Sequence, residues 1–364
     1  FSGSSGIGEL KRFGFNQASG ILLVELDHDD LLAPNCLAAL CGAAQLAEPG
    51  FYYSDFVRFA HDENGFRTTP VYDPTFGFSS YPCVISGQSA LATRAFPPEA
   101  QAMLRIGSAP NHVRAWSKVL YDRLGGHDAT LSVCDDFDLV CRTYASGAPF
   151  THIREPLYLY REHVEQDLSN TYRSRQDDIT RLEADLVVRH GRSVVEAWAK
   201  RRGLPLVDLG GRFNRPDGYI GLDKRSGADI QADALRLPFA TSSIGVLRAV
   251  DFLEHIPIGR TVAAMNEFYR VLAPGGWLLS DTPSTGGYGA FCDPTHVSFW
   301  NALSFRYYYN RNYAKYVPEI TCRFGEGSVW ESFPSEDHKR NRLLYVRADL
   351  FALKGQRIYG TENI

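Results

Sequence analysis

One segment in the second half of the chain, residues 205–224, restricts the possible folds most strongly. It reads PLVDLGGRFNRPDGYIGLDK: one apolar run leads into Gly210 and Gly211, and a second apolar run ends at Asp223. In a parallel sheet, a glycine turn after the first strand lets the backbone approach a nucleoside cofactor, and a carboxylate after the second strand can bind ribose hydroxyls. The segment therefore predicts an α/β domain with a nucleoside site, to which Asp208 in the turn also contributes.

The rest of the second half continues the α/β pattern. Asp233 in QADALRLPF follows the expected third strand, where its loop can face the base. The strand SIGVLRAV (243–250) precedes DFLEHIP, and AAMNEFYRVLAPGGWLLSDTP predicts a helix, a glycine turn and a strand. RNRLLYVRADLFALKG predicts a final strand or hairpin.

A dense functional-looking stretch, GAFCDPTHVSFWNALSFRYYYN, occupies residues 289–310. It follows a strand end on the expected cofactor side, and a histidine there can act as general base toward a hydroxyl at neutral pH. His296 is therefore a candidate catalytic residue. Alternatively, His296 and Trp300 brace an aromatic loop, and we expect the tyrosines at 307–309 to serve packing.

The first half carries two acidic clusters. ILLVELDHDDLL (21–32) is a buried-type strand that ends in acids, where Asp27 and Asp29, with Asp30 adjacent, can offer oxygens to Mg²⁺ or Mn²⁺. Alternatively, Asp29 or Asp30 caps a following helix. The second cluster, Asp135 and Asp136, stands at an expected helix start, where capping is again the alternative.

The second-half motifs VDLGG, GLDK, ADALRLPF, RAVDFLEHIP and RVLAPGGWLLSD together resemble the class I S-adenosylmethionine-dependent methyltransferases, over about residues 204–281. The resemblance implies a Rossmann-like fold, S-adenosylmethionine as cofactor and a set of cofactor-binding residues. These are Asp208, Gly210, Gly211, Asp223, Asp233, Asp251, Glu254 and His255. Arg212 stands where the family usually has a further glycine, and its side chain could fill part of the methionine pocket or pair with Asp208 or the cofactor carboxylate.

The first half resembles the A-type (GT-A) fold of family 2 glycosyltransferases, through LVELDHDD, YSDF, HVRAW, GGHD, DDFDL and YLYREH. The resemblance implies a metal-held nucleotide-sugar diphosphate at Asp27, Asp29 and Asp30, and an inverting reaction with Asp136 as catalytic base beside Asp135. It also suggests residues that read the sugar or acceptor, namely His112, Arg114, Trp116, His127, Arg161 and His163. Trp116 is alternatively a core residue. The family's first strand, helix and strand, which bind the nucleotide base, would lie upstream of Phe1, so we expect this domain to be incomplete at its start.

The expected organisation is thus α/β with two domains, a partial GT-A-like nucleotide-sugar domain and a Rossmann-like class I methyltransferase domain. The first covers residues 1–163, a charged helical linker covers 164–203, and the second domain covers 204–364. The formal net charge of −4 argues against a general nucleic-acid binder. Seven cysteines without a CxxC pair, no visible signal peptide and no apolar stretch of about 20 residues predict a cytoplasmic protein without a membrane span. The oligomeric state stays open.

Three functions are compatible with these patterns. The first is a bifunctional transferase that uses a nucleotide-sugar donor and S-adenosylmethionine to modify a glycan or a glycosylated small acceptor. The second is a methyltransferase alone, with the first half a remnant that holds the acceptor glycan. The third is a non-enzymatic carbohydrate-binding or assembly protein, in which both halves are degenerate.

Overall fold

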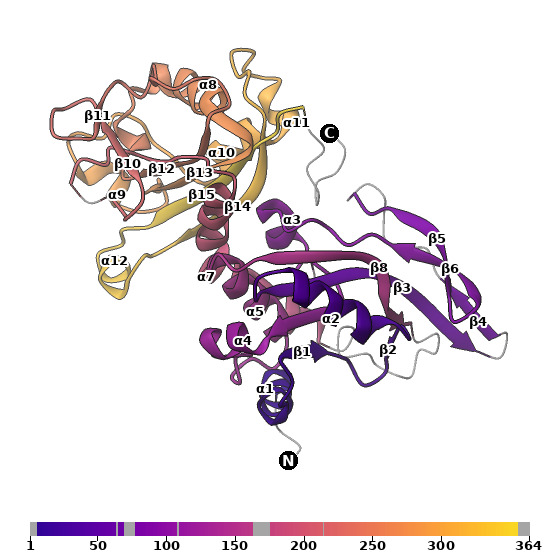
Figure 1. Ribbon diagram of the computed structural model, residues 1–364. Helices are drawn as coiled ribbons and strands as arrows, with labels where there is room; N and C mark the ends of the chain where they lie inside the picture. The colour runs from indigo at the N-terminus through magenta and orange to yellow at the C-terminus, as the bar shows by residue number, and fades with distance from the viewer. Residues whose placement is uncertain are drawn as a thin grey trace. The chain divides into compact units, whose positions relative to one another are not determined.

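The computed structural model describes residues 6–62, 65–68, 77–107, 109–162, 175–213 and 215–355. They divide into two units (Figure 1), of which the first extends to Ala197 and the second begins at Trp198. Helix α7 (Gln176–Arg201) spans this boundary. The described part of the linker expected over 164–203 consists mostly of this helix. Among the residues described, none of the helices combines the length and the apolar character needed to span a bilayer.

The first unit is built on one mixed sheet of eight strands. Strand β3 pairs in parallel with β8 and antiparallel with β4, β6 and β7, and β7 also pairs with β1. Its strands are β1 (Leu22–Glu25), β2 (Leu31–Leu32), β3 (Phe51–Asp62), β4 (Gly65–Thr68), β5 (Ser80–Ile85), β6 (Gln88–Thr93), β7 (Arg114–Ser117) and β8 (Phe150–Arg161). Its helices before α7 are α1 (Ile7–Gln17), α2 (Cys36–Leu46), α3 (Ala100–Arg105), α4 (Lys118–Leu124) and α5 (Asp135–Ala145).

The DHDD acids lie in the loop between β1 and β2, not at a helix start. Helix α2 begins only at Cys36 with Asn35 as its N-cap. The capping alternative for Asp29 and Asp30 is therefore wrong, because five residues, 31–35, separate Asp30 from the first residue of α2. Asp135 and Asp136 do open helix α5, but as its first two residues rather than as its cap.

The second unit contains a sheet of seven strands in the order β11-β10-β9-β12-β13-β15-β14. The five strands from β11 to β13 are parallel, and β15 is antiparallel to both β13 and β14. The strands are β9 (Leu206–Leu209), β10 (Ile220–Asp223), β11 (Ile230–Gln231), β12 (Ile244–Val250), β13 (Leu272–Pro283), β14 (Phe324–Ser332) and β15 (Tyr345–Ala352). The helical segments are η2 (Leu253–His255), η3 (Ile258–Arg260), α8 (Thr261–Val271), α9 (Gly289–Cys292), α10 (Ala302–Tyr309), α11 (Arg311–Ala314) and α12 (Glu336–Arg340).

The strand order of this sheet reverses between β9 and β12. The chain first moves outward from β9 to β10 and β11, and then returns to the other side of β9 for β12 and β13. Open α/β sheets bind ligands outside the carboxyl ends of the strands at such a switch point. The glycine turn after β9 and the DFLEHIP segment after β12 both start at this end.

The core of the second unit lies between the sheet and helices α8 and α10 (Figure 1). Met265 and Phe268 of α8 and Phe305 of α10 are fully buried there against strand residues such as Leu247. The four buried apolar residues Ala264, Met265, Phe268 and Val271 lie on one face of α8 and explain why this helix forms, since burying a large apolar side chain contributes roughly 1.5–3 kcal/mol. The strand after α8 begins at Leu272, so the glycines of LAPGG belong to β13 and not to a separate turn.

The connection between the parallel strands β9 and β10 is unusually short. Only residues 210–219 join them, and the described part of this segment contains no helix. Parallel neighbours are usually joined by a crossover of a dozen or more residues that contains a helix. In its described part, the chain therefore returns to the sheet through bends and a turn, without a helix.

Candidate functional site

The glycine turn after β9 brings three backbone segments close together. Gly210 has a φ of +77°, a conformation that favours glycine. A Cβ on Gly210 would lie 3.1 Å from the Phe252 ring, and one on Gly211 would lie 2.7 Å from an Asp208 carboxylate oxygen. A Cβ on Gly221 of β10 would overlap the carbonyl oxygen of Gly211. Each glycine is therefore required by the close approach of its neighbours at the switch point.

Asp208 is held from inside the sheet. Its side chain is buried and accepts a hydrogen bond of 2.7 Å from Arg248 of the adjacent strand β12. Burial raises the pKa of Asp208, and the cation of Arg248 opposes this effect. The pairing expected for Arg212 is thus made by Arg248, a residue that the motif did not suggest. The guanidinium of Arg212 lies over the ring of Phe213, 4.4 Å from its centre.

Two carboxylates follow the next strands at the same end of the sheet. Asp223 closes β10, and one of its oxygens accepts a 2.6 Å bond from the backbone N–H of Arg225. Asp233 follows β11 and accepts from the N–H of Leu235, with Lys224 Nζ 3.8 Å from its other oxygen. Both acids are thus positioned by local turns at the strand ends.

DFLEHIP forms the wall of the site after β12. Asp251, at a φ of +47°, turns the chain, and its carboxylate raises the pKa of Tyr345 beyond the effect of burial. Glu254 is buried and accepts a 2.5 Å bond from Thr282 through Oε2, while its Oε1 has no partner among the described residues. Burial raises the pKa of Glu254, and the Thr282 hydroxyl opposes this shift.

His255 and His296 complete the polar wall. Their ring centres are 5.2 Å apart, although 40 residues separate them in the chain. With Glu254 they form a group whose possible ligand atoms all lie within 4.8 Å of one another. Among the described residues, these three side chains are the group of possible metal ligands that lie close enough together to hold one ion. The DHDD acids do not belong to this group.

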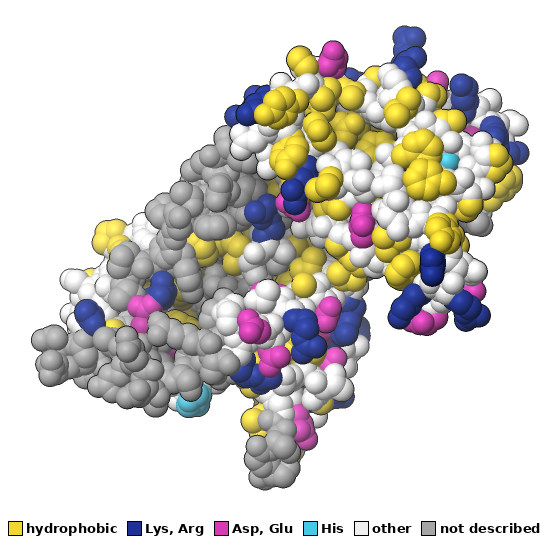
Figure 2. Space-filling model, turned by 180° about the vertical axis from the view of Figure 1, so that it is seen from behind, with side chains coloured by type: hydrophobic (Ala, Val, Ile, Leu, Met, Phe, Trp, Pro, Cys, Tyr) yellow, Lys and Arg dark blue, Asp and Glu magenta, His cyan; other side chains and the backbone are white. Residues whose placement is uncertain are grey.

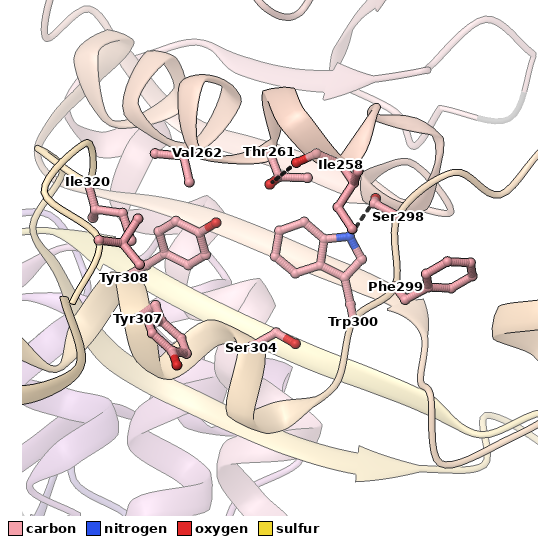
Figure 3. A pocket seen from close by; sticks show the side chains of 11 residues that line it. Ile258, Thr261, Val262, Ser298, Phe299, Trp300, Ser304, Tyr307, Tyr308 and Ile320 are labelled. Carbon is pink, nitrogen blue, oxygen red and sulfur yellow. Dashed lines mark hydrogen bonds between the residues drawn. The ribbon is translucent and has the colours of Figure 1, made fainter.

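A pocket of about 560 Å³ is lined by residues of η3, α8, the 298–300 segment and α10, and none of Glu254, His255 and His296 lines it (Figure 3). The backbone N–H groups of Val297 and Ser298 donate to the carbonyl of Glu254, which ties the pocket wall to the polar group. Trp300 and Tyr308 line the pocket with ring centres 6.3 Å apart, and the Trp300 indole N–H donates to the Ser298 hydroxyl. Figure 2 shows further hydrophobic side chains on this unit, seen from behind. The pocket suits a partly apolar ligand.

The fold and the site together define a Rossmann-like nucleoside-cofactor domain. A family model described as a methyltransferase domain matches residues 220–280, from β10 into β13. The second unit therefore has the Rossmann-like methyltransferase fold that its motifs predicted.

Solved structures similar to part of the chain include two S-adenosylmethionine-dependent methyltransferases and the cyclase SpnF. The methyltransferase from Archaeoglobus fulgidus is 16% identical with a TM-score of 0.29, over 46% of this chain and 96% of that chain. The one from Mesorhizobium loti is 14% identical with a TM-score of 0.29, over 42% and 96%. SpnF is 14% identical with a TM-score of 0.30, over 46% and 82%. At these scores the likeness carries no argument about the reaction, and a comparison with curated proteins finds no match.

The first unit contains a buried charge cluster next to the DHDD loop. Arg114 of β7 pairs with Asp136 at 2.5 Å and lies 3.7 Å from Glu25 of β1. Lys11 of α1 pairs with Glu25 and lies 3.6 Å from Asp27. Although burial opposes ionisation of Asp136, Arg114 lowers its pKa. Neither Glu25 nor Lys11 was expected from the motifs, and both belong to this cluster.

The remaining DHDD acids are partly engaged within the fold. Asp30 accepts bonds of 2.7 Å from the Tyr158 hydroxyl and from the backbone N–H of Arg161. The Arg161 side chain donates to the carbonyl of Asp29 and stacks on Phe59. These contacts tie the loop to β8, which supplies hydrogen-bond donors to both carboxylate oxygens of Asp30.

The other proposed sugar-reading residues differ in accessibility. Trp116 is completely buried and donates to Thr143, which fits the packing alternative rather than a sugar platform. His127 is also completely buried, and burial lowers its pKa to about 4. His112 stacks on Tyr158, and burial likewise lowers its pKa to about 4. His163 lies outside the described residues.

Asp135 provides a prediction for the first unit. Burial raises its pKa to about 7, and Lys11 opposes this shift. Between about pH 4 and pH 7 the folded protein therefore holds a proton that the unfolded chain has released, so the free energy of unfolding falls as pH rises through this window. We expect Asp135→Asn to be more stable than the wild type near pH 8 and to lose that advantage near pH 4.

Urea unfolding near pH 8 and near pH 4 measures the difference in free energy of unfolding between Asp135→Asn and the wild type. Asp122→Asn, at an exposed position on α4, is the matched control and should behave alike at both. An equal difference for Asp135→Asn at the two pH values would contradict the raised pKa.

Proposed function

We propose that the second unit transfers a methyl group from S-adenosylmethionine to a hydroxyl of a small acceptor. One observation carries the proposal: the family match over residues 220–280 covers β10, β11 and β12 and most of β13, which build the switch-point site together with β9 and its glycine turn. Asp223, Asp251 and Glu254 all lie in this matched stretch.

The residues at the switch point fit the cofactor. Gly210 and Gly211 allow the tight turn after β9, and the Asp223 carboxylate is suited to the two ribose hydroxyls. Asp233 would lie toward the base. When bound, S-adenosylmethionine would supply an electrophilic methyl group on a positively charged sulfur.

The chain's own groups would orient the acceptor and remove its proton. The pocket lined by Trp300 and Tyr308 would bind the apolar part of the acceptor, and its hydroxyl would face the Glu254, His255 and His296 group. The sequence suggests His296 as the base. Holding the hydroxyl oxygen in line with the methyl carbon supplies most of what methyl transfer needs.

Binding of S-adenosylmethionine to the full chain tests this proposal. Isothermal titration calorimetry should show one site per chain, also occupied by S-adenosylhomocysteine and not by nicotinamide dinucleotides. Binding of a nicotinamide dinucleotide at that site, without S-adenosylmethionine binding, would overturn the proposal.

Glycosyl transfer in the first unit is a second candidate, favoured by one observation. Asp27 and Asp136, both partly accessible, belong to one charge cluster with Lys11 and Arg114. In this proposal the DHDD acids would hold Mn²⁺ or Mg²⁺ with the nucleotide-sugar, and Asp136 would be the base. Mn²⁺-dependent binding of a nucleotide-sugar to the full chain tests it. Without such binding, the first unit is better described as a domain that holds the acceptor glycan.

A further inference from the structure

Three side chains of types that bind transition metals converge beside the pocket. Glu254 and His255 belong to η2, directly after β12, and His296 lies in the loop that follows α9. Their possible ligand atoms lie within 4.8 Å of one another. A buried carboxylate between two histidines needs a physical reason, since a charge without compensation is costly in the interior.

Hydrogen bonds made by one ring nitrogen of each histidine orient the other ring nitrogen as a possible metal ligand. His255 Nδ1 lies 3.2 Å from the carbonyl oxygen of Thr295, and His296 Nδ1 lies 3.2 Å from that of Ala290. A carbonyl only accepts hydrogen bonds, so each Nδ1 carries the proton and each Nε2 keeps its lone pair. Metal-binding histidines usually donate their other ring N–H in this way.

The carboxylate of Glu254 is also oriented by a hydrogen bond. Thr282 donates to Oε2 and fixes the carboxylate, whereas Oε1 is buried and has no partner among the described residues. The residue as a whole is only 1% exposed. A bound cation would satisfy a buried carboxylate oxygen of this kind beside two imidazoles.

We propose that Glu254, His255 and His296 bind one divalent transition-metal ion of the Zn²⁺ type. Two imidazole nitrogens and one carboxylate oxygen suit Zn²⁺ and its neighbours, whereas Mg²⁺ prefers an all-oxygen shell. Three protein ligands leave at least one coordination position open, which is the arrangement of catalytic rather than structural zinc sites.

The open position suggests the class of acceptor, and this step rests on the proposed methyl transfer. A hydroxyl oxygen bound to the ion would have its pKa lowered, so its proton would pass to water at neutral pH. The oxygen would then form the new bond to the methyl carbon as the bond from that carbon to sulfur breaks. His296 would act as a ligand rather than as the base, and the acceptor would be an alcohol or phenol with an apolar body for the pocket.

Titration of the metal-free full chain with Zn²⁺ and with Co²⁺ tests the site. Calorimetry should show one Zn²⁺ per chain, and Co²⁺ should give visible absorption bands of a bound ion. His296→Ala and Glu254→Gln should each weaken binding by about 100-fold or more. His255→Gln, at an exposed position, keeps the test valid where a buried variant fails to fold.

His338→Ala is the control, because His338 lies on α12 of the same unit, outside the Glu254 group, with a half-buried side chain hydrogen-bonded to Ser335. It should leave both titrations unchanged. If Co²⁺ absorption and Zn²⁺ affinity are the same in His255→Gln and His296→Ala as in the wild type, or if no ion binds, the inference is overturned. Metal binding without S-adenosylmethionine binding would overturn the proposed function and leave the metal site standing. S-adenosylmethionine binding without metal binding would overturn only the metal site.

Discussion

Replacing Asp223 by alanine is expected to weaken S-adenosylmethionine binding by about 100-fold. The carboxylate closes β10 at the switch point, where it would accept bonds from both ribose hydroxyls. Hydrogen bonds to a charged group contribute about 1.5–3 kcal/mol each, and about 2.7 kcal/mol corresponds to a 100-fold change in affinity. Calorimetry on the full chain measures this directly.

A nearby aspartate provides the control for this experiment. Asp217 is exposed in the segment between β9 and β10, six residues before Asp223, so Asp217→Ala should keep the wild-type affinity. The S-adenosylmethionine affinity of Asp223→Asn should lie between those of Asp223→Ala and Asp217→Ala, because an amide oxygen still accepts hydrogen bonds but carries no charge. Unchanged affinity in Asp223→Ala would show that the ribose assignment is wrong.

Replacing Arg114 by methionine is expected to lower the free energy of unfolding of the first unit by about 3–5 kcal/mol. Arg114 is almost completely buried and lies between the carboxylates of Glu25 and Asp136. Methionine fills a similar volume but leaves the buried carboxylate of Glu25 and the half-buried carboxylate of Asp136 with less compensating charge. Removing one member of a buried ion pair has a large effect because the remaining charge cannot reach water. Urea unfolding near neutral pH measures the change.

The pH dependence of this effect has a definite sign. Arg114 lowers the pKa of Asp136 against the effect of burial, so this carboxylate stabilises the wild type above about pH 4 and loses that contribution as pH falls through its folded pKa. The difference in free energy of unfolding between the wild type and Arg114→Met should therefore become smaller as the pH is lowered. Arg123→Met, at an exposed position on α4, is the matched control and should change stability by less than about 0.5 kcal/mol. A similarly small effect for Arg114→Met would contradict the buried-pair interpretation.

Much of the second unit could be predicted from local sequence. VDLGG and YIGLDK are short apolar runs with defined ends, and they form β9 and β10. The helix in AAMNEFYRV and the final strand in LLYVRADLF follow from their apolar patterns and appear as α8 and β15. Such segments carry their own structural signal because their burial pattern repeats within a few residues.

The polar group around Glu254 could not be predicted in the same way. His255 and His296 come from different loops, and only the parallel pairing of β12 with β13 brings those loops to one edge. Arg248, the partner of Asp208, is the first residue of the RAVDFLEHIP motif, but nothing in that motif indicates its pairing with Asp208 on the neighbouring strand. These contacts depend on strand register, which a single sequence specifies only through the complete sheet.

The charge cluster of the first unit escaped prediction for a related reason. Glu25 stands in a strand that reads as apolar, and its cation Arg114 is the register partner on β7. Their proximity follows from antiparallel pairing of strands about 90 residues apart, so no spacing rule within a single segment reveals it.

The short connection between β9 and β10 also bears on the order in which the second unit assembles. Val207 pairs with Ile220 across this loop, whereas Leu206 pairs with Val246 of β12 much later in the chain. The entropy lost on closing a loop grows with the logarithm of its length, by about 0.6 kcal/mol for each doubling. The β9–β10 contact therefore has the smaller closure penalty and can form once Asp223 has left the ribosome, before β12 (244–250) has emerged from it.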